Sequence, residues 1–315
     1  MLQFFQVAIV SSDLASSLRF YAEVFGYRHA GSQGSWGSKI QGLGQDACHL
    51  MWWLVGDQDF FQLELFQYSR PVSRPLPDDW RPSDHGWTRF GVIVADFDES
   101  LRALQRHQIE PLAPPIVKNG RRHIAIRDPF AGTVIELIES DQAEKAGPTV
   151  AYVTSSVSDL ISARAFYESV LELNILPLER LHSPADEALW GLPGAIRDGF
   201  LGEVDSGYLE ILCYSQPPGR PRRSDHRLSD HGIQNISLGS RKREVVSRLL
   251  DRVQGAGYSP PFIFENGENI CGYINDAERE FEFASIPESM DEVYGFAPAR
   301  LDFFGKRNRR LWEPK

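Results

Sequence analysis

Hydrophobic and polar positions follow two different periods along this 315-residue chain. The apolar, β-branched run at 7–10 predicts a strand, and apolar residues at three- and four-residue steps after Asp13 predict a helix with one buried face. Short strand-like runs follow at 39–40, 49–55 and 60–66. The first part of the chain therefore has the predicted order β-α-β-β-β.

The same order recurs three more times. The opening strands of the later modules are predicted at 88–94, 149–154 and 233–238. Their helices begin after Asp96, after Asp159 and near residue 243. The last strands of the three later modules fall at 133–138, near Glu210 and at 280–284. The pattern predicts an α+β fold of four βαβββ modules in two tandem pairs, each pair a curled mixed-sheet half-barrel with its helices outside.

A long repeat supports this organisation. The segment QLELFQYSRP at 62–71 returns as YLEILCYSQP at 208–217, and Ser-Asp-His-Gly occurs both at 83–86 and at 229–232. The same 146 positions separate Glu64 from Glu210 and His85 from His231. Two matches at one offset indicate a gene duplication.

The duplication and the polar linker at 140–148 predict two domains. The first spans 1–140, with modules at 1–68 and 84–140. The second spans 148–287, with modules at 148–215 and 231–287. A C-terminal extension follows at 288–315, and it ends in a basic run that is expected to be solvated or docked.

Composition limits the partners. The net charge is −10 and the pI is about 5.3, which argues against nucleic acid and anionic membranes. No apolar run approaches the roughly 20 residues of a membrane span. Three widely spaced cysteines do not form a disulfide framework, which favours a cytoplasmic location. We expect a small-molecule partner, and a homodimer is compatible with the sequence.

Several motifs resemble the vicinal oxygen chelate superfamily, which includes glyoxalase I, bleomycin-resistance proteins and type I extradiol dioxygenases. They are VAIVSSDL at 7–14 with Phe20-Tyr21, VSDL at 157–160 with Phe166-Tyr167, and RDPFAGTVIEL at 127–137. The resemblance covers about residues 1–285 and is strongest to four-module extradiol and hydroxyphenylpyruvate dioxygenases. It implies that two modules form one cup, with metal ligands on their first strands (His or Gln) and last strands (Glu).

Eight positions of this chain match those ligand positions. The first-strand residues are Gln6, Arg89, Tyr152 and Asn235. The last-strand residues are Glu64, Glu136, Glu210 and Glu282. Tandem pairing would place Gln6, Glu64, Arg89 and Glu136 in a first cup, and Tyr152, Glu210, Asn235 and Glu282 in a second. All four carboxylates are present, whereas no histidine occupies any of these positions.

The expected first cup would contain Arg89 where a metal-binding histidine is expected. A guanidinium is always protonated and cannot bind a metal, so no metal is predicted. Arg89, held by Glu64 or Glu136, could bind an anionic or phenolic oxygen, with Gln6 and His85 as further ligand-binding residues. The other interpretation is a structural Arg–Glu pair that fills a vacated metal site.

The expected second cup would contain Tyr152, Asn235, Glu210 and Glu282, a polar set suited to acid–base chemistry without a metal. His231 is a further catalytic candidate. A hydrogen-bonded remnant of an older site is the other interpretation. The duplicated Asp-His-Gly is also explained by turn chemistry alone, in which the Asp binds nearby backbone and the Gly permits the bend.

Three hypotheses for the function follow. The first is an enzyme acting on a small aromatic, phenolic or dicarbonyl metabolite by metal-independent isomerase, lyase or ring-opening chemistry, with no cofactor and with Trp52, Trp53, Phe60 and Phe61 lining the cup or the core. The second is a metal-free small-molecule binding protein. The third is a dioxygenase or glyoxalase with a single divalent Fe, Mn or Zn ion on displaced ligands.

Overall fold

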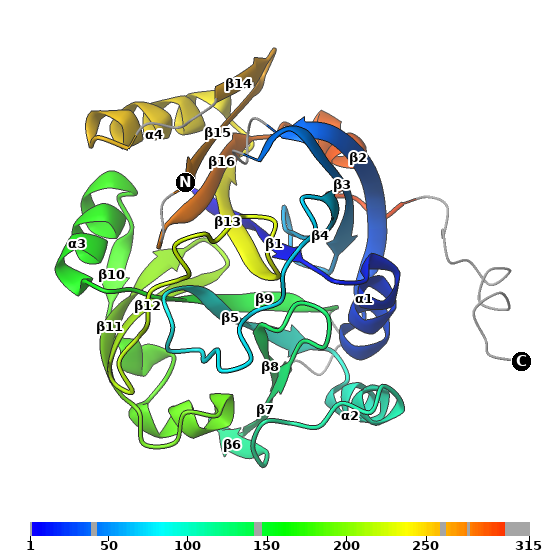
Figure 1. The fold of residues 1–315 in the computed structure, drawn as a ribbon, viewed down its shortest axis with the longest axis vertical. Coiled ribbons are helices and arrows are strands. Elements are labelled where there is room, and N and C mark those ends of the chain that lie inside the picture. Colours follow the sequence, from blue (N-terminus) through cyan, green and yellow to red (C-terminus); the bar gives the residue numbers. More distant parts are fainter. Residues whose placement is uncertain (1, 39–42, 142–146, 259–262, 276–277, 300–315) are drawn as a thin grey trace, which may run out of the picture.

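The structure is a computed structural model, and it describes residues 2–38, 43–141, 147–258, 263–275 and 278–299 (Figure 1). The strand expected at 39–40, the centre of the linker at 140–148 and the basic end of the extension lie outside these residues. None of the described helices is both long enough and apolar enough to cross a membrane.

The first two modules have the predicted order. Module one consists of β1 (Gln3–Val10), α1 (Leu14–Phe20), β2 (Arg28–Ser38), β3 (Gly44–Val55) and β4 (Gln62–Arg70). Module two consists of β5 (Gly86–Val94), α2 (Phe97–Arg106), β6 (Ile116–Lys118), β7 (Arg121–Arg127) and β8 (Val134–Glu139). A π-helical turn, Tyr21–Phe25, extends α1.

The last two modules follow the same order. Module three consists of β9 (Thr149–Ser156), α3 (Leu160–Ala165), β10 (Asn174–Leu176), β11 (Ile196–Val204) and β12 (Gly207–Gln216), with a π-helical turn at Phe166–Val170. Module four consists of β13 (Gly232–Ser240), α4 (Arg243–Gly255), β14 (Ile263–Asn266), β15 (Asn269–Asn275) and β16 (Glu280–Ser285). The chain then forms a 3-10 turn (Glu288–Met290) and α5 (Asp291–Tyr294).

Three of the four main helices begin at the predicted aspartates. The side chains of Asp13, Asp96 and Asp159 accept hydrogen bonds from backbone N–H groups of the first helical turn. Each bond satisfies a donor that has no partner within its helix. In module four Lys242 takes this position and makes no side-chain cap.

The strands form two eight-stranded mixed sheets, which confirms the α+β class and the pairing of modules. The expected tandem partners are wrong, however. One sheet has the order β14-β15-β16-β13-β1-β4-β3-β2, and the other β10-β11-β12-β9-β5-β8-β7-β6. Module one therefore pairs with module four through antiparallel β1 and β13, and module two pairs with module three through β5 and β9. The linker at 140–148 therefore connects β8 and β9, which belong to the same sheet, and does not connect two separate cups.

The two sheets pack against each other around one hydrophobic core. This core contains Val7 and Ile9 from β1, Phe90 and Val92 from β5, and the buried faces of the helices. The helices lie around the outside of the sheets (Figure 1). Because successive residues of a strand point to opposite faces, the positions between these core residues face the inside of each curled sheet.

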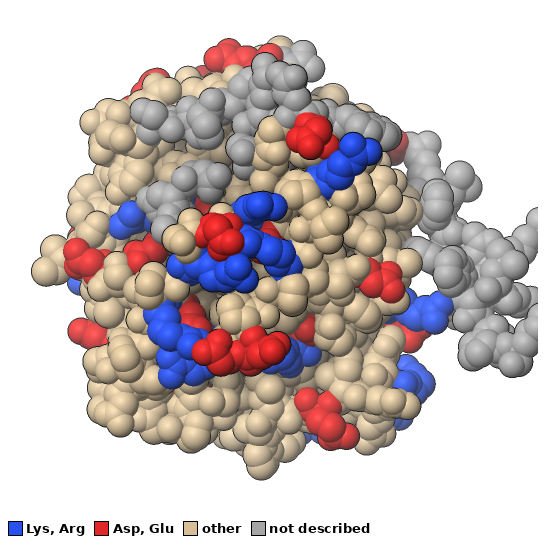
Figure 2. Space-filling model, viewed as in Figure 1, with Lys and Arg blue, Asp and Glu red and all other residues tan. Residues whose placement is uncertain are grey.

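Two connectors, residues 71–85 between β4 and β5 and residues 217–231 between β12 and β13, cross the middle of the molecule and bind each other reciprocally. Arg74 in the first connector donates to Asp230 Oδ1 and Oδ2 at 2.9 and 2.7 Å, and Arg220 in the second donates to Asp84 Oδ1 and Oδ2 at the same distances. Figure 2 shows acidic and basic side chains gathered across this face. We call these two ion pairs the connector clasp.

Candidate functional site

The strand register confirms that the eight predicted positions are structurally equivalent. In every module, the last-strand glutamate lies opposite a first-strand residue two positions beyond the predicted one. The opposed pairs are Glu64 with Ala8, Glu136 with Gly91, Glu210 with Thr154, and Glu282 with Ser237. The repeat therefore aligned the four modules correctly.

The pairing of modules divides the eight residues differently from the expectation. Gln6, Glu64, Asn235 and Glu282 share the sheet of modules one and four; we call this set site A. Arg89, Glu136, Tyr152 and Glu210 share the other sheet and form site B. Neither expected cup exists, because each would combine residues from different sheets.

Site B is built around the buried guanidinium of Arg89. Its Nη2 atom donates to Glu210 Oε2 at 2.9 Å, and its Nη1 atom donates to the Tyr214 hydroxyl at 3.0 Å. The Trp190 ring covers the guanidinium, with Cζ 3.8 Å from the ring centroid. Glu64 lies in the other sheet, so the predicted Arg89–Glu64 contact is absent from the described structure.

His182 joins the two carboxylates of site B. Its Nδ1 atom lies 2.8 Å from Glu210 Oε1, and its Nε2 atom lies 3.4 Å from Glu136 Oε2. Glu136 also contacts His123 Nδ1 at 2.6 Å and accepts a hydrogen bond from Tyr152. Any side chain at Gly91 would collide with the Tyr152 ring, which lies across that strand.

The pKa values of Glu210, Glu136 and His182 in site B are shifted in the directions expected for a network of buried ion pairs. Burial alone would raise the pKa of Glu210, but the charges of His182 and Arg89 outweigh it and hold that pKa far below its usual range. Burial likewise opposes the depressed pKa of Glu136, which the hydrogen bonds of His123 and His182 cause. The pKa of His182 is raised, because the charge of Glu210 overcomes desolvation. The guanidinium of Arg89 and the imidazole of His182 therefore balance the two buried carboxylates.

A segment of module three fills site B. Two 3-10 helices, Leu178–Arg180 and Pro184–Trp190, lie between β10 and β11 and bring His182 and Trp190 into the site. Arg89 and Glu210 have no exposed side-chain surface. Arg89 thus pairs with Glu210 rather than with Glu64 or Glu136, and the closed site supports the interpretation of a structural Arg–Glu pair.

Site A is built around the side-chain amide of Gln6. One amide atom of Gln6 lies 2.8 Å from Glu64 Oε2 and 3.1 Å from Glu282 Oε2. Trp53 Nε1 donates to Glu64 Oε1 at 2.9 Å, and the Tyr273 hydroxyl donates to Glu282 Oε1 at 2.7 Å. The two carboxylates thus share one amide, while each has a further donor of its own.

Asn235 stands apart from this centre. Its Nδ2 atom lies 3.4 Å from the Ser237 hydroxyl, which in turn donates to Glu282 Oε2 at 2.8 Å. Ser237, rather than Asn235, therefore contacts a carboxylate of site A.

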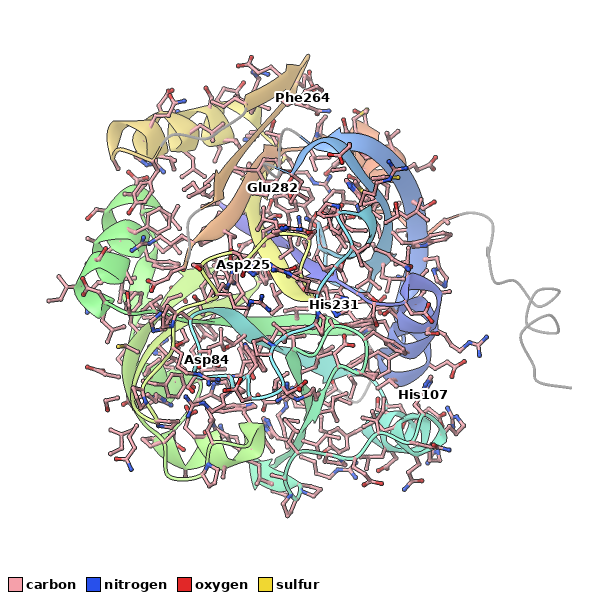
Figure 3. The ribbon with its side chains drawn as sticks, in the orientation of Figure 1. Asp84, His107, Asp225, His231, Phe264 and Glu282 are labelled. Carbon is pink, nitrogen blue, oxygen red and sulfur yellow. The ribbon has the colours of Figure 1, made fainter. Side chains whose placement is uncertain are left out.

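The pKa of Glu64 is shifted by burial and by the nearby carboxylate of Glu282. Burial, with the charge of Glu282, raises the pKa of Glu64 to about 8, against hydrogen bonds from Trp53 and Gln6 that lower it. Glu64 consequently holds a proton at neutral pH. Glu282, Cys271 and Tyr273 are partly exposed, whereas Glu64 is 8% exposed, so site A opens on the module-four side. Figure 3 shows Glu282 on the inner part of its sheet.

An aromatic wall extends from Glu64 along β3 and β4. Alternate residues of the two strands are opposite each other: Trp53 with Glu64, Met51 with Phe66, and His49 with Tyr68. His49 packs its ring against Phe66 and Tyr68, with ring centroids 5.3 and 4.9 Å away. Of the four aromatic residues expected to line a cup, Trp53 lies beside site A, whereas Phe61 and Trp52 belong to the helix-side core and Phe60 packs near the C-terminal segment.

His85 and His231 lie in the connectors rather than in either site (His231 is labelled in Figure 3). The backbone N–H of each donates to the other connector, at Arg220 and Arg74. His85 Nδ1 lies 3.2 Å from Glu278 Oε1. Asp84 and Asp230 accept from the backbone N–H three residues earlier, and both following glycines have positive φ. These contacts support the turn interpretation of Asp-His-Gly.

The sequence reasoning missed the residues that complete both sites. These residues are Trp53 and Tyr273 as donors in site A, Gln62 beside Gln6, and His182, Trp190 and Tyr214 in site B. A capping box at Ser183 and Asp186, with Pro184 between them, marks the segment that carries His182 and could have predicted its short helix.

The donor set of site A does not fit the iron or zinc sites of the resembling family. It offers two carboxylates, side-chain amides and the Cys271 thiol, which lies 3.3 Å from Glu282 Oε1, but no imidazole, the ligand that suits both iron and zinc. Across the described residues, no three His, Cys, Asp or Glu side chains converge to hold a metal ion. Site B presents a guanidinium and an imidazole between its carboxylates, which occupy the position of a cation.

A half-open cavity of about 600 Å³ lies away from both sites. It is lined by residues 171–174 and 203–205 of module three and by the side of α4 that carries Arg248 and Arg252. None of the eight predicted residues reaches it.

Comparison with known proteins agrees with this architecture. Residues 5–126 match the Glyoxalase/Bleomycin resistance protein/Dioxygenase superfamily. Glyoxalase I from Zea mays superposes with a TM-score of 0.60 at 14% identity, covering 96% of this chain and 98% of that one. A protein from Bacillus subtilis that is described as a candidate dioxygenase superposes with a TM-score of 0.60 at 12% identity, covering 98% and 94%. A search of curated protein sequences found no match.

These likenesses extend over all four modules, although the identities are low enough to establish the fold alone. The chain has the vicinal oxygen chelate fold, and residues 5–126 match the model of the Glyoxalase/Bleomycin resistance protein/Dioxygenase superfamily.

Proposed function

We propose that site A is the active site of an enzyme that transfers a proton on a small aromatic or dicarbonyl molecule without a metal. The observation that carries this proposal is the Glu64–Glu282 pair, joined by Gln6 on a partly open inner face. Site B is closed on all sides and leaves no surface for a substrate.

Two carboxyl groups side by side can supply both halves of a proton transfer, one as the acid and the other as the base. Glu64, with its pKa raised to about 8, is a proton donor at neutral pH. Glu282 is the partner that accepts a proton, and its partial exposure puts it in reach of a bound molecule. A carbonyl oxygen that receives a hydrogen bond from Glu64 makes the neighbouring C–H more acidic, so that Glu282 could remove its proton.

The aromatic wall supports an aromatic substrate. Phe66 and Tyr68 stack with an interplanar angle of 16° and a centroid distance of 5.8 Å, and they continue the line that begins at Glu64 and Trp53. A flat molecule could place its oxygens at the carboxylates and its ring on this wall. Three unpaired cysteines, Cys48, Cys213 and Cys271, support the proposal of a cytoplasmic location.

Deuterium exchange tests the proposed chemistry directly. With 1-phenyl-1,2-propanedione in D2O as the probe, we expect the wild-type protein to accelerate exchange of the methyl protons, as followed by NMR. Glu282→Gln should reduce this acceleration at least 100-fold, because the base is lost. The matched control is Glu99→Gln, which changes an exposed carboxylate on α2.

The result also decides between an enzyme and a binding protein. Binding of this probe or of a phenol panel without any exchange or turnover would overturn the enzymatic proposal. It would favour a protein that only holds its ligand.

A further inference from the structure

The half-open cavity beside α4 lies between parts of the chain that belong to different sheets; we call it the α4 cavity. One wall is a single face of α4, because its lining residues Val245, Arg248, Leu249 and Arg252 recur at three- and four-residue steps. The other walls are residues 171–174 and 203–205 of module three, together with Leu2. Figure 1 shows α4 and β10 on the same side of the molecule. The volume of about 600 Å³ is typical of small-molecule sites.

The floor of the α4 cavity is apolar. Leu171, Leu173, Val204 and Leu249 are buried and belong to the main hydrophobic core. Leu2 is partly buried and packs against the same core. A ligand in the cavity would therefore remove apolar surface from water, which favours a ligand with an apolar part of its own.

The positive charges at the rim come from α4. Arg252 is already paired, because its Nη2 atom lies 3.2 Å from Glu172 Oε2 and its Nε atom donates to the Val170 carbonyl oxygen at 3.0 Å. Arg248 is exposed, and no hydrogen bond or ion pair joins it to another described residue. The guanidinium of Arg248 is therefore available to an anionic group.

The negative charges at the rim come from the end of β11. Glu203 Oε2 accepts from Asn174 Nδ2 at 2.7 Å, and Asp205 Oδ2 accepts from Gln3 Nε2 at 3.2 Å. Both donors are neutral amides, so among the described residues no cation balances either carboxylate. The cavity thus presents an unpaired guanidinium on one element and two unpaired carboxylates on another, around an apolar floor.

The backbone at Glu172 also marks this place. Glu172 has a φ of +57°, a left-handed conformation that favours glycine, and the same repeat position in module one is Gly26, with a φ of +87°. Module three therefore keeps a glutamate where its backbone is better suited to glycine. Strained residues of this kind concentrate at functional sites, and the Glu172 carboxylate holds Arg252 in the cavity wall.

We propose that the α4 cavity is a binding site for a free α-amino acid with a large apolar side chain. The carboxylate of the ligand binds Arg248, whose guanidinium matches it with two parallel N–H donors. Its ammonium group binds Glu203 and Asp205, and its side chain covers the leucine floor. This site is separate from site A and does not depend on the function proposed for site A.

The two signs of charge exclude simpler ligands. An apolar carboxylic acid would bring its negative charge close to Glu203 and Asp205 without a positive group to meet them. An apolar amine would satisfy those two carboxylates but leave Arg248 without a partner. A residue inside a peptide chain carries neither charge. A free amino acid uses both.

Calorimetric titration of the full chain tests the proposal with three matched probes. L-Phenylalanine should bind at one saturable site per chain. Phenethylamine lacks its carboxylate and 3-phenylpropionate lacks its ammonium group, so each should bind at least tenfold more weakly. L-Leucine and L-tryptophan extend the series to other apolar side chains.

Two charge variants identify the roles of the rim. Arg248→Gln should weaken L-phenylalanine at least tenfold but leave phenethylamine unchanged, because only the carboxylate contact is lost. Glu203→Gln should weaken both ligands. The matched control is Arg106→Gln, which removes an exposed arginine from α2 and should change neither affinity.

Two further measurements locate the site. Val245→Trp places a large side chain in the cavity and should abolish binding, since Val245 lies on the lining face of α4. In hydrogen exchange, L-phenylalanine should slow the backbone amides of residues 171–174 and 245–252 while those of α2 exchange as before.

Several results would overturn the proposal. They are the absence of saturable binding by L-phenylalanine, L-leucine and L-tryptophan, equal binding of phenethylamine or 3-phenylpropionate, and an unchanged affinity in Arg248→Gln. Binding that survives Val245→Trp would contradict this location, as would a loss of affinity in Arg106→Gln that equals the loss in Arg248→Gln. Failure of proton exchange on a diketone would contradict only the function proposed for site A.

Discussion

The side-chain amide of Gln6 lies 3.1 Å from Glu282 Oε2, although 276 positions separate the two residues in the chain. The first and last modules therefore complete one site, while the two middle modules complete the other. This arrangement leaves one open carboxylate pair and one closed ionic network. The predictions below test the different roles that follow for the two sites.

The pH dependence of stability should identify Glu64. Its pKa is about 8 in the folded protein, against 4.5 for an ordinary glutamate, so the folded state retains a proton that the unfolded state releases. Stability is thus lost as the pH rises from about 4.5 to about 8. Glu64→Gln removes this loss, and its free energy of unfolding relative to wild type should rise across that window.

The measurement is urea unfolding at pH 5, 7 and 9. One unit of pKa difference corresponds to about 1.4 kcal/mol, so a relative gain of a few kcal/mol is expected by pH 9. A difference between variant and wild type that is independent of pH would contradict the raised affinity of Glu64 for its proton.

Site B should behave as part of the core. Arg89→Met leaves Glu210 without its guanidinium partner in a position with no exposed surface, and removal of one partner of a buried pair costs about 3–5 kcal/mol. Chemical denaturation measures the loss. Arg102→Met, which breaks an exposed pair with Glu99, should leave the free energy of unfolding nearly unchanged.

The same Arg89 variant separates the two sites. If it remains folded, the proton exchange proposed for site A should be unchanged, since Arg89 lies in the other sheet. A loss of ligand binding or proton exchange in a fully folded Arg89→Met protein would show that site B takes part in function.

His182 should contribute stability that depends on pH. Its pKa is raised in the folded protein by Glu210, so the contribution is fully present below the ordinary histidine pKa and is lost as the pH rises through the folded value. His182→Gln should be less stable than wild type at pH 6, with a smaller deficit at pH 9. Thermal unfolding across this range measures the difference, and a deficit that grows with pH would contradict a protonated His182.

The two ion pairs of the connector clasp should contribute cooperatively to the free energy of unfolding. Arg74→Ala and Arg220→Ala each remove a two-bond contact to a mostly buried aspartate, so each should lower the free energy of unfolding, by a modest amount because the arginines are partly exposed. The double variant measures their coupling. If the two pairs act independently the losses add, whereas a double loss smaller than the sum indicates that breaking one pair already loosens the other connector.

Local chemistry explains why the sequence predicted the modules well. The aspartate caps of α1, α2 and α3 and the alternation in β4 depend on neighbours within a few residues, so their pattern is visible in the chain itself. The duplication then transferred the position of Glu64 to Glu210 without any structural knowledge. The short helices at Leu178–Arg180 and Pro184–Trp190 were missed because they interrupt the module and follow no period.

The sequence by itself therefore determined the four modules, their equivalent positions and the absence of histidine from those positions. Only the tertiary structure decided which modules share a sheet. The exposed edge of one first strand can pair with that of any other module, because backbone hydrogen bonds carry no label of their partner, and β1 pairs with β13 rather than with β5. That choice placed Glu64 beside Glu282 and Arg89 beside Glu210. It separated the open pair from the closed network.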